Sequence, residues 1–156
     1  MNYGLILYNN HYEVLFIVVK MLKTSDFFPS LKALKNSQNL FIIRDAGNID
    51  ACPCVILIGA GVEPRCLNCG LCGVKDCAAA KDGGISCAMA VHDLGIAVGS
   101  AAATAMDHRI DNRVLFTAGM AALKLRLFSD NVKICFGIGL SATGKNIFFD
   151  RRATGV

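Results

Sequence analysis

Residues 65–77 read RCLNCGLCGVKDC, and this short run holds four of the eight cysteines in the chain. A fifth cysteine, Cys87, follows after a Gly-Gly pair. Thiols this close together either form disulfides or bind a metal, and both alternatives constrain the local backbone. A chain of 156 residues can bury a core without disulfides, and its first residues lack the pattern of a secretory signal. We therefore expect reduced cysteines that bind a metal or a cluster in the cytoplasm.

The spacing of these five cysteines favours an iron–sulfur cluster over zinc. Structural zinc sites are usually built from two separated pairs of ligands, and this loop has no second pair. A 4Fe–4S cluster suits one tight loop that supplies three thiolates and a more distant residue that supplies the fourth. Gly70 and Gly73 directly follow cysteines, so backbone amides could approach the negatively charged cluster. The spacing is Cys66-x2-Cys69-x2-Cys72-x4-Cys77-x9-Cys87.

Five cysteines compete for four irons, and the spacing leaves two ligand sets open. The first set consists of Cys69, Cys72, Cys77 and Cys87. The second set contains Cys66 in place of Cys77, which gives the C-x2-C-x2-C run of bacterial ferredoxins.

The rest of the chain predicts an α+β fold in a single domain, residues 1–156. We expect a mixed β-sheet packed against helices with the iron–sulfur loop inserted, and an α/β layered sandwich is the alternative. Residues 12–23 fit either a helix or a strand, and residues 45–50 predict a turn. The predicted strands are residues 3–8, 39–44, 54–61, 132–140 and 146–151, and helices are predicted after Ser30, from Cys87 and over Arg113–Phe128.

Composition narrows the functional classes. Hydrophobic residues make up 54% of the chain and charged residues 18%, and the net charge of +4 comes from scattered basic residues. This balance is not that of a disordered chain, and we expect no nucleic-acid partner. The two most apolar stretches, residues 14–22 and 94–106, are shorter than the roughly 18 residues of a spanning helix. We therefore expect no membrane insertion.

Small residues recur every four positions after Cys87, at Gly95, Gly99 and Ala103. They share one face of the predicted helix, where another backbone or a flat cofactor could approach closely. Tight helix packing is the interpretation that we favour.

Residues 139–146, GLSATGKN, nearly match the phosphate-binding loop of nucleotide hydrolases. Asn146 replaces the hydroxyl residue that binds magnesium, and no helix is predicted to follow and supply its dipole. A milder prediction is a site for an anion such as the phosphate of FMN. Its residues would be Ser141, Thr143, Gly144 and Lys145.

Two further groups of residues have structural interpretations. The polar residues Asp93, Asp107, His108, Asp111 and Arg113 could form a polar site near the helix junction, but helix capping and buried pairing is the interpretation that we favour. Buried, inert thiols explain Cys52, Cys54 and Cys135, which lie in or beside apolar strands.

The segment CGLCGVKDCAAA resembles the CGxCGxxxC signature of a small iron–sulfur domain. That domain occurs in corrinoid iron–sulfur proteins and in membrane electron-transport ferredoxins. The resemblance implies ligands at the two cysteines of CxxC, at the next cysteine and at one distal cysteine. On this chain those positions are Cys69, Cys72, Cys77 and Cys87.

A longer stretch, from about Phe41 to Arg152, resembles an uncharacterised family of ferredoxin-domain proteins from anaerobic bacteria and archaea. The segments that carry the resemblance are FIIRDAGNID, VILIGAG, LNCGLCG, DLGIAVGSAAATAMDHRIDNRVLF and GLSATGKNIFFDR. Residues 1–35 are atypical of that family and lack its Ala-Arg-Thr-Ala-Pro-Lys-like stretch.

Together these patterns predict a protein that binds one 4Fe–4S cluster and exchanges single electrons with a redox partner protein. The sequence is also compatible with a homodimer. The main alternative is an oxidoreductase, since the predicted helices and residues 137–144 loosely resemble the C-terminal half of nitroreductase-like flavoproteins. In such a protein the cluster would feed a bound FMN. A zinc-stabilised interaction module is the third alternative. The chain shows no recognisable Ser–His–Asp or paired-carboxylate arrangement.

Overall fold

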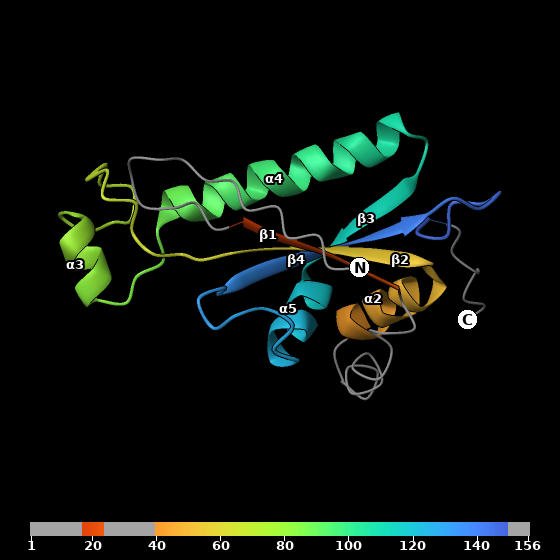
Figure 1. The fold of residues 1–156 in the computed structure, drawn as a ribbon, viewed down its shortest axis with the longest axis horizontal. Coiled ribbons are helices and arrows are strands. Elements are labelled where there is room, and N and C mark those ends of the chain that lie inside the picture. The colour runs from red at the N-terminus through yellow and green to blue at the C-terminus, as the bar shows by residue number, and fades with distance from the viewer. Residues whose placement is uncertain (1–16, 24–39, 150–156) are drawn as a thin grey trace.

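The computed structural model describes residues 17–23 and 40–149, in which helices cover both faces of a four-stranded sheet (Figure 1). The elements in chain order are β1 (Ile17–Lys23), α2 (Leu40–Ala51), β2 (Cys54–Ala60), α3 (Cys77–Asp82), α4 (Ala88–Asp107), β3 (Asp111–Leu115), α5 (Phe116–Lys124) and β4 (Ile134–Ser141).

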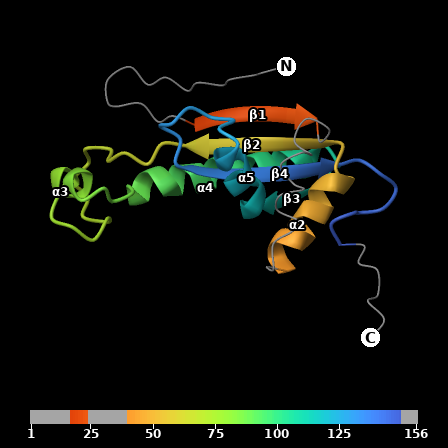
Figure 2. The same cartoon turned by 90° about the horizontal axis from the view of Figure 1, so that it is seen from below.

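The strands follow the order β1-β2-β4-β3, and every neighbouring pair is antiparallel (Figure 2). α4 carries the chain back along the sheet, so β3 runs in the same direction as β2. β4 lies between β2 and β3 and runs the opposite way. The α+β class is therefore confirmed, but the expected mixed sheet is wrong, because the strands that share a direction are not neighbours.

Helices lie on both faces of the sheet (Figure 1), and two apolar layers, one on each face, form the core. α4 packs on one face through Leu94 and Val98, which contact Ile58 and Ile138. α2 and α5 cover the other face. The buried residues of that second layer are Ala46, Ile49, Cys52, Val55, Leu57, Leu115, Ala118, Ala121, Ala122, Phe128, Val132, Cys135 and Phe148.

α5 lies directly against the backbone of β4. A Cβ atom on Gly119 would stand only 1.7 Å from the carbonyl oxygen of Cys135. A Cβ atom on Gly137 would stand 2.5 Å from the Cβ of Ala118. The helix reaches this close position only because both residues have no side chain.

The predicted strand at residues 39–44 and the turn after it are wrong, because Leu40–Ala51 form α2. Ala46 and Ile49 are three residues apart and both enter the core shared with α5. Asp45, which is 4% exposed, accepts a 2.7 Å hydrogen bond from the Thr117 hydroxyl of α5. These contacts with α5 stabilise the helical conformation.

The predicted helix over residues 113–128 is also partly wrong, because its first residues belong to β3 and pair with β4. The strands at 54–61 and 132–140 and the helix after Cys87 are confirmed as β2, β4 and α4. Residues 146–149 form a turn rather than a strand, with the Phe149 amide bonded to the Asn146 carbonyl oxygen. The predictions for residues 3–8, for Ser30 and for 150–151 lie outside the described residues.

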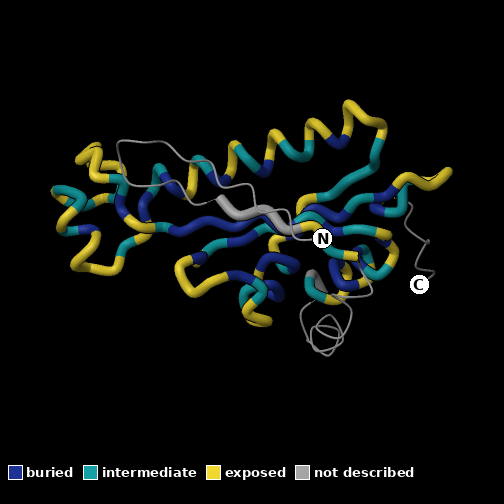
Figure 3. The backbone as a smooth tube through the Cα atoms, viewed as in Figure 1, coloured by how far each residue is buried: buried dark blue, intermediate teal, exposed yellow. Residues whose placement is uncertain are grey.

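α4 exposes a long face, and exposed positions recur along it (Figure 3). Gly95 and Gly99 are exposed, and no heavy atom lies within 4 Å of the place of a Cβ at either residue. The expected tight packing of this face is therefore absent from the described part of the chain. α4 has 20 residues and a mean hydropathy of 1.2. Among the described helices, it alone is long and apolar enough to span a membrane. Core helices of folded domains pass the same test but are mostly buried, whereas 22% of the apolar stretch of α4 is buried.

Candidate metal centre

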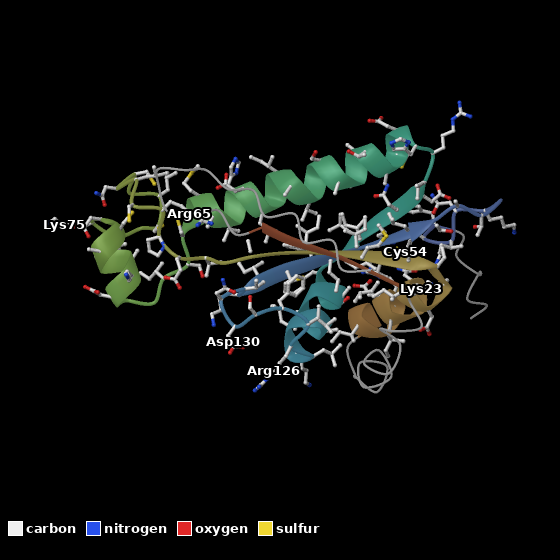
Figure 4. All side chains as sticks on the ribbon, in the orientation of Figure 1. Lys23, Cys54, Arg65, Lys75, Arg126 and Asp130 are labelled. Atoms are coloured by element: carbon white, nitrogen blue, oxygen red, sulfur yellow. The ribbon has the colours of Figure 1, made fainter. Side chains whose placement is uncertain are left out.

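The cysteine loop joins β2 to α4 and extends with α3 from one end of the sheet (Figure 4). The Cys87 amide closes its base with a 2.8 Å hydrogen bond to the carbonyl oxygen of Val62. Arg65 and Lys75 mark this end in Figure 4, whereas Cys54 lies at the opposite end.

One cavity in this loop is lined by Cys69, Cys72, Cys77 and Cys87. Cys87 is 2% exposed and Cys69 lies on the surface, so the four thiols run from the core to the solvent. Cys66 does not line the cavity, and its thiol lies 4.0 Å from the carbonyl oxygen of Pro64. The other lining residues are Arg65, Leu67, Gly70, Val74, Asp76, Ala80 and Met89.

The backbone of the loop alternates between left-handed and ordinary conformations. Cys66, Asn68 and Gly70 have φ angles of 56°, 48° and 73°, and Gly73 has 75°. Alternation of this kind turns successive amides toward one side and forms concavities that bind anions, including iron–sulfur clusters. Gly70 and Gly73 adopt these angles without the steric cost of a side chain.

Two backbone amides already point at cysteine sulfurs. The Asn68 amide donates to Cys77 Sγ at 3.3 Å, and the Ala88 amide donates to Cys72 Sγ at 3.4 Å. Asn68 also uses its side chain, since its Oδ1 accepts from the Cys77 amide at 2.9 Å. Such amides stabilise negative charge on a thiolate and on a cluster that it binds.

Two helix starts hold two of the cysteines. Cys77 is the first residue of α3, whose N-cap Asp76 accepts a 2.8 Å hydrogen bond from the Ala79 amide. Cys87 is the N-cap of the 20-residue helix α4, where the helix dipole favours negative charge.

The environment of Cys87 favours its thiolate. Burial raises the pKa of this thiol. Hydrogen bonds from the backbone of Ala90, Arg65 and Met89 and from the Cys72 side chain lower the pKa by more than burial raises it. The net pKa is below the ordinary value of a cysteine. A thiolate is the form that binds metal.

The donors fit a cluster better than a single ion. Within residues 17–23 and 40–149, no three His, Cys, Asp or Glu side chains stand close enough together to hold one metal ion. Zinc, bound at about 2.3 Å to each sulfur, would need the sulfurs within about 4 Å of one another. A cluster carries its own sulfides and spreads its ligands over a larger volume. Four thiols line one small cavity of about 10 Å³, and backbone amides are directed at two of them, so the type of donor matches a cluster.

The predicted anion loop lies at the opposite end of the sheet, because β4 ends at Ser141 beside the start of β2. Ser141 is 1% exposed, and its Oγ lies 3.3 Å from Thr143 Oγ1. Thr143 donates at 2.7 Å to the carbonyl oxygen of Lys145. The hydroxyls therefore serve the loop itself, and nothing in the geometry of Ser141, Thr143, Gly144 and Lys145 supports an FMN phosphate.

The polar residues near the end of α4 do not form one site. Asp111 accepts from Asn146 Nδ2 at 3.0 Å, and Arg113 donates to the Phe148 carbonyl oxygen at 3.2 Å. Both side chains thus hold residues 146–149 in place. Asp93 lies in the first half of α4, about 21 Å from Asp107 at the usual rise per residue.

Burial raises the pKa of Cys52 and of Cys135 to about 12, and the neighbouring Cys54 adds to the effect at Cys52. Burial also raises the pKa of Cys54. All three thiols therefore stay protonated near neutral pH, and Cys52 and Cys135 are buried in the core as expected, whereas Cys54 is only partly buried.

Sequence reasoning missed Asn68 and the amide of Ala88. Their contacts with Cys77 and Cys72 span 9 and 16 positions along the chain, so no local pattern reveals them. The available signal is that Asn68 directly precedes Cys69 and that asparagine tolerates a positive φ better than most residues.

Residues 83–151 match the family described as "Uncharacterized protein containing a ferredoxin domain". An uncharacterised protein from Archaeoglobus fulgidus is 37% identical over 118 residues, which cover 70% of this chain and 63% of that protein. The chain thus spans less than two thirds of this relative. No solved structure matches. The family match contains Cys87, while an alignment over 70% of this chain must include its middle, where the other cysteines lie. These similarities confirm the family resemblance that the motifs carry.

Proposed function

We propose that this chain, whose residues 83–151 match the ferredoxin-domain family, binds one 4Fe–4S cluster and transfers single electrons. The ligands in this proposal are Cys69, Cys72, Cys77 and Cys87. The observation that carries it is their position around one cavity, which Cys66 does not line.

A bound cluster would supply a centre that accepts and donates one electron at a time. The chain would hold that centre through the thiolates and would stabilise its negative charge through the amides of Asn68 and Ala88. The buried Cys87 and Ala80 would keep water from the inner side. The exposed Cys69 would leave the outer side open to a partner.

The surface beside Cys69 suits contact with a redox protein in the cytoplasm. Leu67 and Leu71, on either side of Cys69 in sequence, are 60% and 63% exposed. Transient electron-transfer partners bury small surfaces, and two exposed leucines beside the centre would contribute apolar area to such a contact. The proposal involves no nucleic acid and no membrane.

Anaerobic purification with iron, sulfide, zinc and flavin analysis tests the proposal. We expect a brown protein with about four irons per chain, broad absorbance near about 400 nm and an electron paramagnetic resonance signal after reduction. A colourless protein that contains zinc would contradict it. Bound FMN would instead favour the oxidoreductase alternative.

A further inference from the structure

A second cavity lies directly beside the cluster cavity. It is formed by the start of the cysteine loop, by the end of α3 with the turn that follows, and by the residue before β4. Ala80 lines both cavities and is fully buried between them. The lining residues are Val62, Glu63, Pro64, Ala80, Lys81, Gly84, Ile85, Ser86 and Lys133.

Positive charge predominates in this second cavity. Lys81 comes from the last turn of α3, whereas Lys133 precedes β4 and is fixed by a 3.0 Å bond from its amide to the Ala60 carbonyl oxygen. Ser86 adds a hydroxyl, and Glu63 is the one acidic residue among the lining side chains. Two lysines against one glutamate leave a net positive charge that attracts an anion.

The remaining walls are apolar, and the volume fits a small molecule. Val62, Pro64 and Ile85 line the cavity, which measures about 360 Å³. Cavities of roughly 300 Å³ and above accommodate small organic ligands. A ligand that uses both kinds of wall would carry an anionic group and a short apolar body.

We propose that this cavity binds a small organic anion, a carboxylate or phosphate with a short apolar chain, and that its occupancy lowers the reduction potential of the neighbouring centre. The second part rests on the proposed function. Reduction adds one negative charge to the centre, and an anion beyond Ala80 opposes that charge. By linkage, the reduced protein binds the anion more weakly than the oxidised protein does. The ratio of these two affinities sets the size of the shift in potential. A tenfold ratio corresponds to about 59 mV for one electron.

Binding is measured first, by titration calorimetry of the anaerobic full chain with two probes, sodium hexanoate and inorganic phosphate. We expect hexanoate to bind more tightly than phosphate, because it also covers Val62 and Ile85. Lys81→Gln and Lys133→Gln should each weaken binding about tenfold or more. Lys124→Gln removes a lysine of α5 that does not line the cavity and should leave binding unchanged. Equal affinities for wild type and both cavity variants, or no binding of either probe, would overturn the site.

The coupling is measured next, as the midpoint potential of the centre with and without hexanoate. We expect a lower potential with hexanoate in the wild type and in Lys124→Gln, and a smaller shift in Lys133→Gln at the same hexanoate concentration. An unchanged wild-type potential despite calorimetric binding would refute the coupling and leave the binding site in place. A preparation without iron would refute the proposed function, whereas the calorimetric result would still decide whether the anion site exists.

Discussion

Asn68 exchanges two hydrogen bonds with Cys77, one through its own amide and one through its side chain. Its φ of 48° turns the amide toward the sulfur. The side-chain oxygen holds the backbone at the start of α3. A residue that binds no metal therefore sets the position of one of the four cysteines around the cavity.

Asn68→Gly keeps access to a positive φ but removes the acceptor for the Cys77 amide, whereas Asn68→Ala also adds backbone strain. The lost hydrogen bond costs about 1 kcal/mol, and the strain adds about 1–2 kcal/mol. We expect iron loss to a chelator to be slowest in wild type, faster in Asn68→Gly and fastest in Asn68→Ala. Identical rates in wild type and both variants would show that Asn68 does not position Cys77.

The buried thiols give a pH-dependent prediction. Cys52 and Cys135 have a pKa of about 12 in the folded protein, against 9.0 as the ordinary value. Between these values the unfolded chain loses protons that the folded chain keeps, so unfolding becomes easier as pH rises. We expect the free energy of unfolding to fall from about pH 9 upward, and to fall less in Cys135→Ala. A Cys135→Ala protein with the same slope as wild type would argue against this source.

At the scale of elements, the close contact of α5 with β4 fixes one face of the sheet. The apolar runs of β2 and β4 are clear from sequence, because buried strands need continuous hydrophobic residues. α2 is not clear, because Phe41, Ile42 and Ile43 suit a strand equally well and only packing against α5 decides. β3 is hidden for a similar reason, since its strand conformation depends on pairing with β4.

Gly119→Ala and Gly95→Ala place the same methyl group at two helical positions with opposite surroundings. At Gly119 the new atom would overlap the backbone of Cys135, so we expect a loss of about 1–3 kcal/mol or more in the free energy of unfolding. At Gly95 nothing lies within 4 Å, and alanine should add about 0.5–1 kcal/mol through its helix propensity. Denaturant unfolding of both variants measures the difference. A stability loss at Gly95 equal to that at Gly119 would contradict this packing.

At the scale of the whole molecule, the antiparallel register places the two loops that the sequence predicts to bind ligands at opposite ends of the sheet. The cysteine loop follows Ala60 at one end of the sheet, and residues 142–146 follow Ser141 at the other. The cysteine spacing predicts a cluster loop because the ligands are close in sequence. The second cavity cannot be predicted in this way, because Lys81 and Lys133 meet only through the fold.

The iron content of two single variants tests directly which cysteines hold the cluster. Cys77 lines the cavity and Cys66 does not, although both belong to the same short loop. We expect anaerobically prepared Cys66→Ser to retain about four irons per chain and the signal of the reduced centre, and Cys77→Ser to lose or degrade the cluster. Iron loss in Cys66→Ser together with a retained cluster in Cys77→Ser would contradict this ligand set and favour the one that contains Cys66.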